Sequence, residues 1–229
     1  MSNNKKVKEL MAIISIQSEI KNILPQIQLA GLEASVAIAP TSPDQGVWIR
    51  KQIEKLQVKL SPETIRQTPN VKATKDAYRA LGKDPNRYRP AAEALMRRIA
   101  NGKGLYEILN AVDVLNYISI KTGFSICGYD ASQIVGNISL GIGKAKEPYE
   151  GIGRGELNIE RLPVFRDAVG AFGTPTSDST RTMINHKTNK IIFIYIGFNA
   201  KDELEEALTE TTALLVKYAD ATDVSTFFI

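Results

Sequence analysis

Apolar side chains recur at helical spacing through much of the first half of the chain. The segments 48–60, 90–100 and 105–121 carry them every three or four positions, which is the spacing of one face of an α-helix. Another helix is predicted to begin at residues 61–63, Ser-Pro-Glu, which supply a cap, a first-turn proline and a first-turn acid. Gly123 is expected to end the helix over 105–121. We therefore expect several helices before residue 124.

Strand patterns dominate the second half. The run IIFIYIGF at 191–198 is apolar on both faces and predicts a central strand, and an acidic first turn predicts a last helix from Asn199. Shorter apolar runs predict strands at 13–16, 32–39, 134–142, 157–159 and 164–165. This order of elements indicates the α+β class, with mixed or antiparallel sheets and flanking helices.

The helix predicted over 105–121 carries a polar stripe within an otherwise apolar run. Asp113 lies three positions before Asn116 and four before Tyr117, and Asn116 lies three before Ser119, and these steps place the residues on one face. Polar groups on a core-type helix cost stability unless they have partners or face a cleft. The stripe therefore marks a candidate site. The alternative for Asp113 is that it holds a neighbouring loop by accepting backbone N–H bonds.

Composition indicates one soluble domain. The chain has 229 residues, a net charge of +4 and 43% hydrophobic residues, so it can bury a core and permits contact with a polyanion such as RNA. The single cysteine, Cys127, allows no internal disulfide and fits a reducing cytosol. No run approaches the roughly 20 apolar residues that span a bilayer. We expect a cytoplasmic protein without membrane contact, and the sequence leaves its oligomeric state open.

Metal and cofactor motifs are weak in this sequence. One histidine and one cysteine cannot build a zinc site, and His186 lies in NHKTNK, which indicates a turn and disfavours a Ser-His-Asp hydrolase. The glycine-rich segment 141–155 is not a P-loop, because Ile138 and Ala145 stand where glycine and Ser or Thr are needed. We therefore predict no metal and no cofactor. A basic loop that approaches phosphate without a motif stays open.

Six short segments occur in an order and spacing that are fairly specific as a set. They are RYRPAAEALMRRI, VDVLNYISI, GYD, GNISL, GRGEL and SDSTRT. Together they resemble the free-standing relatives of the tRNA-editing module of the phenylalanyl-tRNA synthetase beta subunit, the B3/4 domain. The resemblance runs from Ala73 to Thr188, about half of the chain.

The resemblance implies an α+β domain like the editing domain of the synthetase beta subunit. It implies a single domain over 1–229, in which residues 1–70 form an N-terminal extension packed on a core at 73–220. In the synthetase, this module forms a cleft that hydrolyses the ester of a wrongly attached tyrosine. The implied partners are tRNA, the 3′ end of aminoacyl-tRNA, or a small aminoacyl ligand.

Residue by residue, the likeness to the synthetase is incomplete. The segment 112–117 matches the synthetase segment VDVTNY, and Asn116 falls on an editing-pocket asparagine, whereas Leu115 replaces a pocket threonine. The segment 126–130 matches one that ends His-Ala-Phe-Asp, so Cys127 replaces an editing-site histidine. These two departures argue against tyrosine editing.

An aminoacyl ester is already activated, so its hydrolysis needs a positioned water and a stabilised oxyanion more than a strong base. The candidate catalytic residues are Asn116, Ser177, Asp178, Ser179 and Arg181. The candidate pocket residues are Asp113, Leu115, Ser119, Cys127, Tyr129 and Asp130. Asp130 is explained equally well as a turn residue, and Cys127 is predicted to underlie the pocket without acting as a nucleophile. We expect Asn116, Tyr129 and the segment 177–181 to converge on one pocket.

Basic residues suggest where RNA would bind. The candidate RNA-binding residues are Arg87, Arg89, Arg97 and Arg98, followed by Lys83, Lys144, Lys146 and Arg154. Glu93 lies four positions before Arg97, so an intrahelical ion pair explains Arg97 as well.

Three functions remain open at this point. The leading interpretation is a cytosolic domain with an editing-type cleft that binds tRNA or an aminoacyl compound and hydrolyses misacylated tRNA esters, without being a tRNA ligase. The rival is a non-catalytic RNA- or small-ligand-binding module, which Leu115 and Cys127 favour. The third is a hydrolase of a free amino-acid derivative that uses no RNA. The sequence does not decide between enzyme and binding module.

Overall fold

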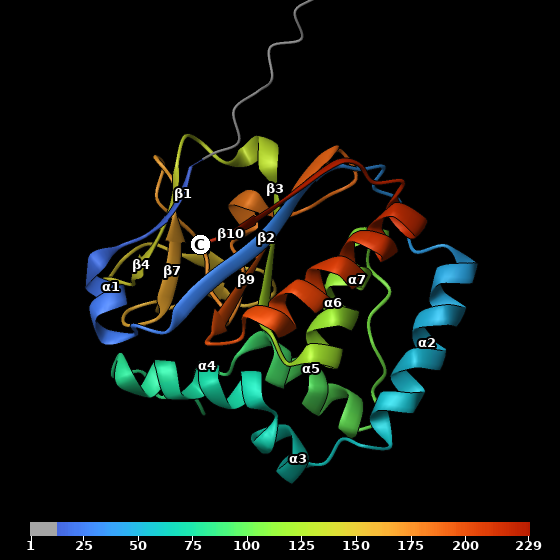
Figure 1. Cartoon of the computed structure of the whole chain (residues 1–229), viewed down its shortest axis with the longest axis horizontal. Helices are drawn as coiled ribbons and strands as arrows, with labels where there is room; N and C mark the ends of the chain where they lie inside the picture. Colours follow the sequence, from blue (N-terminus) through green and yellow to red (C-terminus); the bar gives the residue numbers. More distant parts are fainter. Residues whose placement is uncertain (1–12) are drawn as a thin grey trace, which may run out of the picture.

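The computed structural model describes residues 13–229 (Figure 1), which form two four-stranded sheets and a two-stranded hairpin. Sheet 1 has the strand order β10–β2–β9–β3, and all neighbouring strands are antiparallel. Its strands are β10 (Thr222–Phe228), β2 (Ile27–Ser35), β9 (Lys190–Phe198) and β3 (Ile126–Asp130). β10 and β3 are therefore its edges.

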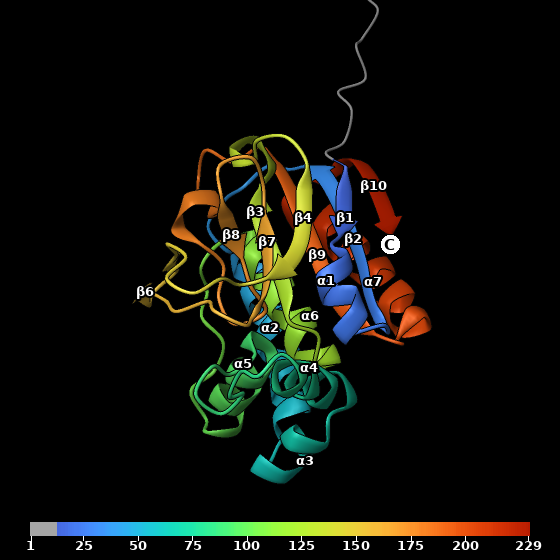
Figure 2. The same ribbon diagram turned by 90° about the vertical axis from the view of Figure 1, so that its left-hand side faces the viewer.

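Sheet 2 packs against one face of sheet 1 and is turned toward the viewer in Figure 2. Its order is β1–β4–β7–β8, in which β1 and β4 are parallel and the other pairs antiparallel. The strands are β1 (Ile14–Ile16), β4 (Ile138–Ile142), β7 (Pro163–Arg166) and β8 (Ala171–Gly173). One mixed and one antiparallel sheet confirm the predicted α+β class.

The middle of sheet 1 is buried on both faces, as its apolar sequence predicts. On β9, Ile192 and Ile194 belong to the core between the sheets, together with Phe165 of sheet 2. Phe193 and Tyr195 point the other way, into the core under the helices. Each such side chain contributes about 1.5–3 kcal/mol by leaving water. The predicted central strand at 191–198 is confirmed.

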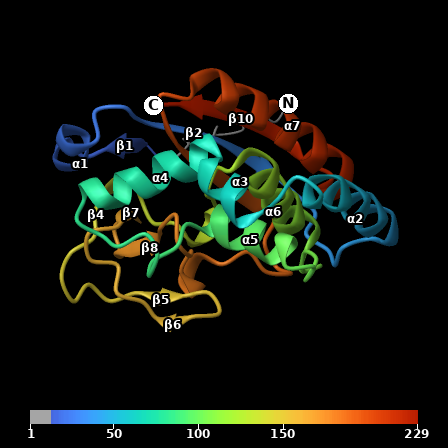
Figure 3. The same ribbon diagram turned by 90° about the horizontal axis from the view of Figure 1, so that it is seen from below.

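Helices cover the outer face of sheet 1 and close one end of the molecule (Figures 1 and 3). Leu115 of α6 and Leu204 of α7 share the core with Phe193, whereas Ala77 of α4 belongs to the core between the sheets. None of the helices within residues 13–229 is long and apolar enough to cross a membrane. The helices are α1 (Ser18–Ile23), α2 (Pro43–Gln57), α3 (Pro62–Gln67), α4 (Pro69–Ala80), α5 (Ala91–Ala100), α6 (Asn110–Thr122) and α7 (Lys201–Ala219), with 3₁₀ turns η1 (Ala131–Gln133) and η2 (Thr180–Thr182).

A small hairpin of β5 (Glu150–Gly151) and β6 (Gly155–Glu156) lies on the side of the molecule away from α7 (Figure 3). The strand predicted at 157–159 is wrong. The chain turns there, because the Asn158 side chain accepts the N–H of Glu160 at 3.0 Å. The glycine-rich segment therefore serves as a surface hairpin.

Local signals in the sequence set some element ends. Ser61 caps α3, because its hydroxyl accepts the N–H of Thr64 at 3.1 Å and the Thr64 hydroxyl accepts the N–H of Ser61 at 2.8 Å. This reciprocal cap confirms the predicted start. The strand predicted over 134–142 begins only at Ile138. Residues 134–137, which follow the 3₁₀ turn η1, have no regular structure.

The segment before residue 70 contributes strands to both sheets. β1 pairs with β4 in sheet 2, and β2 lies between β10 and β9 in sheet 1. Of the strand predicted at 32–39, only residues 32–35 belong to β2, which begins earlier, at Ile27, and ends at Ser35. Residues 1–12 of the predicted domain lie outside the described range.

Candidate functional site

The candidate site lies at the edge of β3 that does not face β9. The segment 174–179 follows this edge, and the N–H of Gly128 donates to Oδ2 of Asp178 at 3.0 Å. The N–H of Ser179 donates to the carbonyl of Phe172 at 2.9 Å. The segment thereby links the edge of sheet 1 to β8 of sheet 2.

Tyr129 points from β3 into the space between the sheets. Its ring meets those of Phe165 and Phe172 edge-on, with centroids 6.4 and 4.7 Å away. Gly173 leaves room for its phenol, because a β-carbon at that position would lie 1.7 Å from the hydroxyl oxygen. The position of the Tyr129 hydroxyl therefore depends on a glycine in the other sheet.

Four buried ionisable groups gather here, and we name them the Asp178 cluster: Cys127, Tyr129, Tyr149 and Asp178. Burial, and next the nearby Asp178, raise the pKa of Cys127, Tyr129 and Tyr149. Within residues 13–229, the Tyr129 hydroxyl and Oδ1 of Asp178 form no hydrogen bond of acceptable geometry, although the groups are close enough to shift each other's pKa. Because its pKa is raised, the thiol of Cys127 is protonated at neutral pH.

Asp178 differs from ordinary carboxylates because no cation pairs with it among residues 13–229. Burial raises its pKa from 3.8 to about 7, although the hydrogen bond from the Gly128 N–H acts in the opposite direction. Asp178 is therefore a group that changes charge near neutral pH.

A cleft of about 720 Å³ opens beside the Asp178 cluster. Tyr149 belongs to both, since it lines the cleft while its hydroxyl donates to the carbonyl of Ser177 at 2.6 Å. The remaining lining residues are Glu147, Pro148, Glu150, Glu156, Val169, Gly170, Ala171, Ser179 and Arg181. The cleft thus has polar and apolar walls, as a small-molecule site requires.

Ser179 and Arg181 lie in the cleft wall. The Ser179 hydroxyl accepts the N–H of Arg181 at 3.3 Å and so caps η2. The guanidinium of Arg181 donates to both carboxylate oxygens of Asp167, at 2.9 and 3.1 Å. Burial alone would raise the pKa of Asp167, but these bonds and backbone N–H bonds lower it. The charge of Arg181 is therefore already paired.

The predicted pocket residues on α6 lie behind β3. The Leu115 side chain packs against Gly128 and Phe193 on the helical face of sheet 1, whereas Cys127 points to the other face. Ser119 is buried and Asn116 is half-buried, and Asn116 has no side-chain hydrogen bond to any residue in 13–229. Convergence of Asn116 with the segment 177–181 stays a prediction.

Asp113 holds a loop, which was the alternative for this residue. Its carboxylate accepts the N–H of Ile108 at 3.0 Å and the hydroxyl of Thr41. Burial raises its pKa, although these hydrogen bonds act in the opposite direction. They hold the preceding loop in place, so α6 begins at Asn110 and the predicted helix start at Leu105 is wrong.

Asp130 orders the chain after β3. One of its carboxylate oxygens accepts the N–H and hydroxyl of Ser132 at 3.0 and 2.6 Å, and the other accepts the hydroxyl of Thr188 at 2.7 Å. His186 is exposed in the turn that sequence reasoning expected. Within residues 13–229, no group of three or more His, Cys, Asp or Glu is placed to hold a metal ion.

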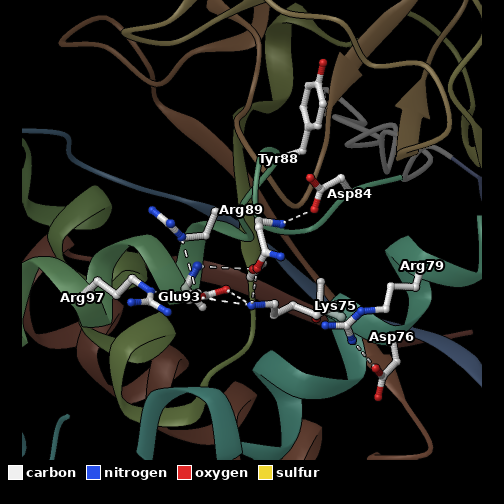
Figure 4. Close-up of polar contacts among 12 residues, drawn as sticks. Lys75, Asp76, Arg79, Asp84, Tyr88, Arg89, Glu93 and Arg97 are labelled. Atoms are coloured by element: carbon white, nitrogen blue, oxygen red, sulfur yellow. Dashed lines mark hydrogen bonds and ion pairs between the residues drawn. The ribbon is translucent and has the colours of Figure 1, made fainter. Parts of the chain in front are cut away.

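The predicted RNA-binding arginines have unequal surroundings. Arg98 donates to the carbonyls of Lys103 and Gly104 and stacks on Tyr106, so it is held by the loop after α5. Arg87 is exposed. Arg89 and Arg97 approach one buried carboxylate (Figure 4).

Lys83 is a buried anchor. Its ammonium donates to the carbonyls of Asn158 and Glu160 at 2.9 and 2.7 Å and lies over the Tyr88 ring. Burial lowers its pKa to about 8. By contrast, Lys144, Lys146 and Arg154 are exposed on the glycine-rich segment.

Tyr149 is the site residue that sequence reasoning missed. It stands among glycines and charged residues in the segment 141–155, and its aromatic side chain was a signal there of a buried position. Its contact with the Ser177 carbonyl joins segments that are far apart in the sequence, so spacing could not reveal it.

The B3/4 domain family matches residues 73–220, which is more than half of the chain, and the chain therefore belongs to this family. The chain is also similar to a solved N-terminal fragment of the phenylalanyl-tRNA synthetase beta subunit from Pyrococcus horikoshii, with 13% identity and a TM-score of 0.47. That similarity covers 96% of this chain and 52% of the fragment, so the chain spans about half the length of the fragment. No match was found among curated proteins.

Proposed function

We propose that this protein binds the aminoacylated 3′ end of tRNA, or a small aminoacyl compound, in the cleft beside the Asp178 cluster and hydrolyses the aminoacyl ester. Membership of the B3/4 family supports this ligand class, because the family resembles a tRNA-editing module. The observation that carries the chemistry is Asp178, a carboxylate with a pKa of about 7 next to a cleft lined by Tyr149 and Ser179.

In the proposed reaction, Asp178 is the general base. A carboxylate with a pKa near the working pH accepts a proton from water effectively. The water oxygen bonds to the ester carbonyl carbon while its proton moves to Asp178. The tetrahedral intermediate then breaks its bond to the ribose oxygen, which takes the proton back from Asp178. Oδ1 of Asp178 and the Tyr129 hydroxyl are enclosed atoms without a well-formed hydrogen bond, and they would hold the water and the oxyanion once the ligand reaches them from the cleft.

Cys127 does not act as the nucleophile in this proposal. A nucleophilic cysteine needs a lowered pKa, whereas burial and the neighbouring Asp178 raise the pKa of Cys127. Cys127 instead forms the floor of the cluster beneath Asp178.

The test is ester hydrolysis with a panel of misacylated tRNAs and free aminoacyl esters. The wild type should release amino acid faster than buffer, and Asp178→Asn should lose about 100-fold or more of that rate. Asp202→Asn, at an exposed position at the start of α7, is the matched control and should keep the full rate. Equal rates for wild type and Asp178→Asn would contradict the proposed role of Asp178.

A non-catalytic binding module is the second candidate. One observation favours it: the Asp178 carboxylate is enclosed and accepts the Gly128 N–H, so it could serve only to join the edge of β3 to the segment 174–179. This candidate predicts that the wild type binds aminoacyl-tRNA without releasing amino acid above the buffer rate.

A further inference from the structure

Four side chains on α4, on α5 and in the loop between them form an ionic group, which we name the Glu93 cluster (Figure 4). The Glu93 carboxylate is 1% exposed and has three cations around it. The nearest nitrogen of Arg97 lies at 2.8 Å, that of Lys75 at 3.1 Å and that of Arg89 at 3.7 Å.

The Glu93 cluster carries two surplus positive charges. None of its three cations has a second carboxylate within 4 Å among residues 13–229. Of the acids labelled nearby in Figure 4, Asp76 pairs with Arg79, and Asp84 accepts the N–H of Asn86 and forms no ion pair with the three cations. Like charges held close together repel one another, more so where water is partly excluded. An added anion would relieve this repulsion.

The donors needed to hold such an anion are free. Arg97 donates to Glu93 through Nε alone, and Arg89 makes no hydrogen bond within residues 13–229. The terminal nitrogens of both guanidiniums are therefore without partners. Their side chains are 29% and 42% exposed, whereas Lys75 is 8% exposed. Glu93 thus holds two arginines at a surface that solvent reaches.

The loop that carries Arg89 is fixed against the segment of the candidate site. The N–H of Ala91 donates to the carbonyl of Pro175 at 2.8 Å, and the hydroxyl of Thr176 approaches the carbonyl of Tyr88 at 3.4 Å. The Glu93 cluster and Asp178 are therefore connected through a few residues. A ligand whose reactive end lies in the cleft could extend toward the arginines.

We propose that Arg89 and Arg97 bind one backbone phosphate of an RNA strand, with Glu93 as the positioning residue and Lys75 as a buried supporting charge. Guanidinium groups match phosphate with two parallel N–H bonds, and each such charge-assisted bond is stronger than a neutral one. This inference rests on the proposed function for its ligand, RNA. The inference goes beyond the proposed function because it assigns a phosphate site to two arginines. Arg98, a third candidate from the sequence, is not part of that site.

The experiment measures RNA binding over a range of salt concentrations. The probe is an acceptor-stem RNA without an attached amino acid. Arg89→Ala/Arg97→Ala should bind at least about tenfold more weakly than wild type, and the slope of log affinity against log salt should fall in magnitude by roughly one. Arg79→Ala is the matched control, because it removes an arginine that already pairs with Asp76. It should change affinity less than about twofold.

A second variant separates geometry from charge. Arg89→Lys/Arg97→Lys keeps the cations that Glu93 needs for folding but lacks the guanidinium fork. It should bind RNA more weakly than wild type with an almost unchanged salt slope. Affinity equal to wild type in both double variants would overturn the phosphate site while leaving the proposed function standing.

Inorganic phosphate provides an arm that does not depend on RNA. Phosphate should raise the thermal unfolding midpoint of wild type above that in chloride of equal ionic strength, and should do so less in Arg89→Ala/Arg97→Ala. If RNA does not bind wild type but phosphate still stabilises it through these arginines, the RNA source is overturned and a small-anion site remains. If neither binds, the whole inference is overturned.

Discussion

Two buried carboxylates of this protein have opposite electrostatic surroundings. Asp178 has no cation beside it within the described chain, and burial raises its pKa to about 7. The Glu93 side chain is 1% exposed and has Lys75, Arg89 and Arg97 around it. Burial alone therefore does not decide the charge of a carboxylate; the charges that surround it do.

The two settings suit different tasks. A carboxylate without a cation can gain and lose a proton near neutral pH, which is what a general base requires. A carboxylate among three cations fixes the cations in place. The first arrangement fits proton transfer at the cleft, and the second fits the holding of an anionic ligand.

A large loss of stability should follow removal of the carboxylate of the Glu93 cluster. Glu93→Gln leaves three cations together without a counter-charge, and one of them, Lys75, is buried. We expect a loss of about 3 kcal/mol in the free energy of unfolding, measured with urea. Glu205→Gln, which breaks an exposed pair with Lys201, is the control and should cost less than about 0.5 kcal/mol. Equal losses of unfolding free energy in both variants would show that the buried ion pairs of Glu93 stabilise the fold no more than an exposed pair does.

A smaller loss should follow crowding of the Asp178 cluster. Gly173→Ala places a methyl group against the Tyr129 hydroxyl, and such overpacking costs about 1–3 kcal/mol. The second change Tyr129→Phe removes the hydroxyl and should restore part of the loss, which a double-mutant cycle of unfolding free energies measures. Additive losses would contradict the close contact between these two residues.

The pH dependence of stability tests the pKa of Asp178. Because the pKa of Asp178 rises from 3.8 to about 7 on folding, the folded state binds the proton more tightly. Its contribution is complete below pH 4 and is lost as the pH rises to 7, by up to about 1.4 kcal/mol per pH unit. Asp178→Asn should remove this decline from urea unfolding curves recorded between pH 4 and 8. If the unfolding free energy of Asp178→Asn falls with pH as steeply as that of the wild type, another group causes the decline.

The smallest expected effect concerns Cys127. Because burial and Asp178 raise its pKa, its thiol should react with iodoacetamide at neutral pH only as fast as the protein opens. Cys127→Ser should keep most of any hydrolytic activity. Rapid selective alkylation of Cys127 in the folded protein, or an acyl group trapped on it, would show that the thiol acts as a nucleophile.

Some elements could be predicted because their signal is local. The strand at 191–198 is apolar on both faces, and the reciprocal cap at Ser61 lies within four residues. β10 was missed because its sequence, TDVSTFF, alternates weakly and is a strand only through its pairing with β2, almost 200 positions earlier in the chain. The hairpin of β5 and β6 was likewise hidden, since glycines predict turns without predicting which strands they join.

The candidate site was predictable in part. The segment 177–181 was identified from its polar residues, and Ser179 and Arg181 do line a cleft. The role of Tyr149 and the state of Asp178 depend on which groups surround them, and those groups come from three separate segments of the chain.

The sequence by itself determined the α+β class, the central strand, most of the helices and the family, because periodicity, caps and motifs are properties of neighbouring residues. The tertiary structure decided which distant charges meet. Arg89 and Arg97 stand four positions from Glu93 in the sequence, but only folding brought Lys75 to Glu93 and left Asp178 without a cation among residues 13–229. Desolvation and Coulomb interactions depend on distances in space, and those distances exist only once the chain has folded.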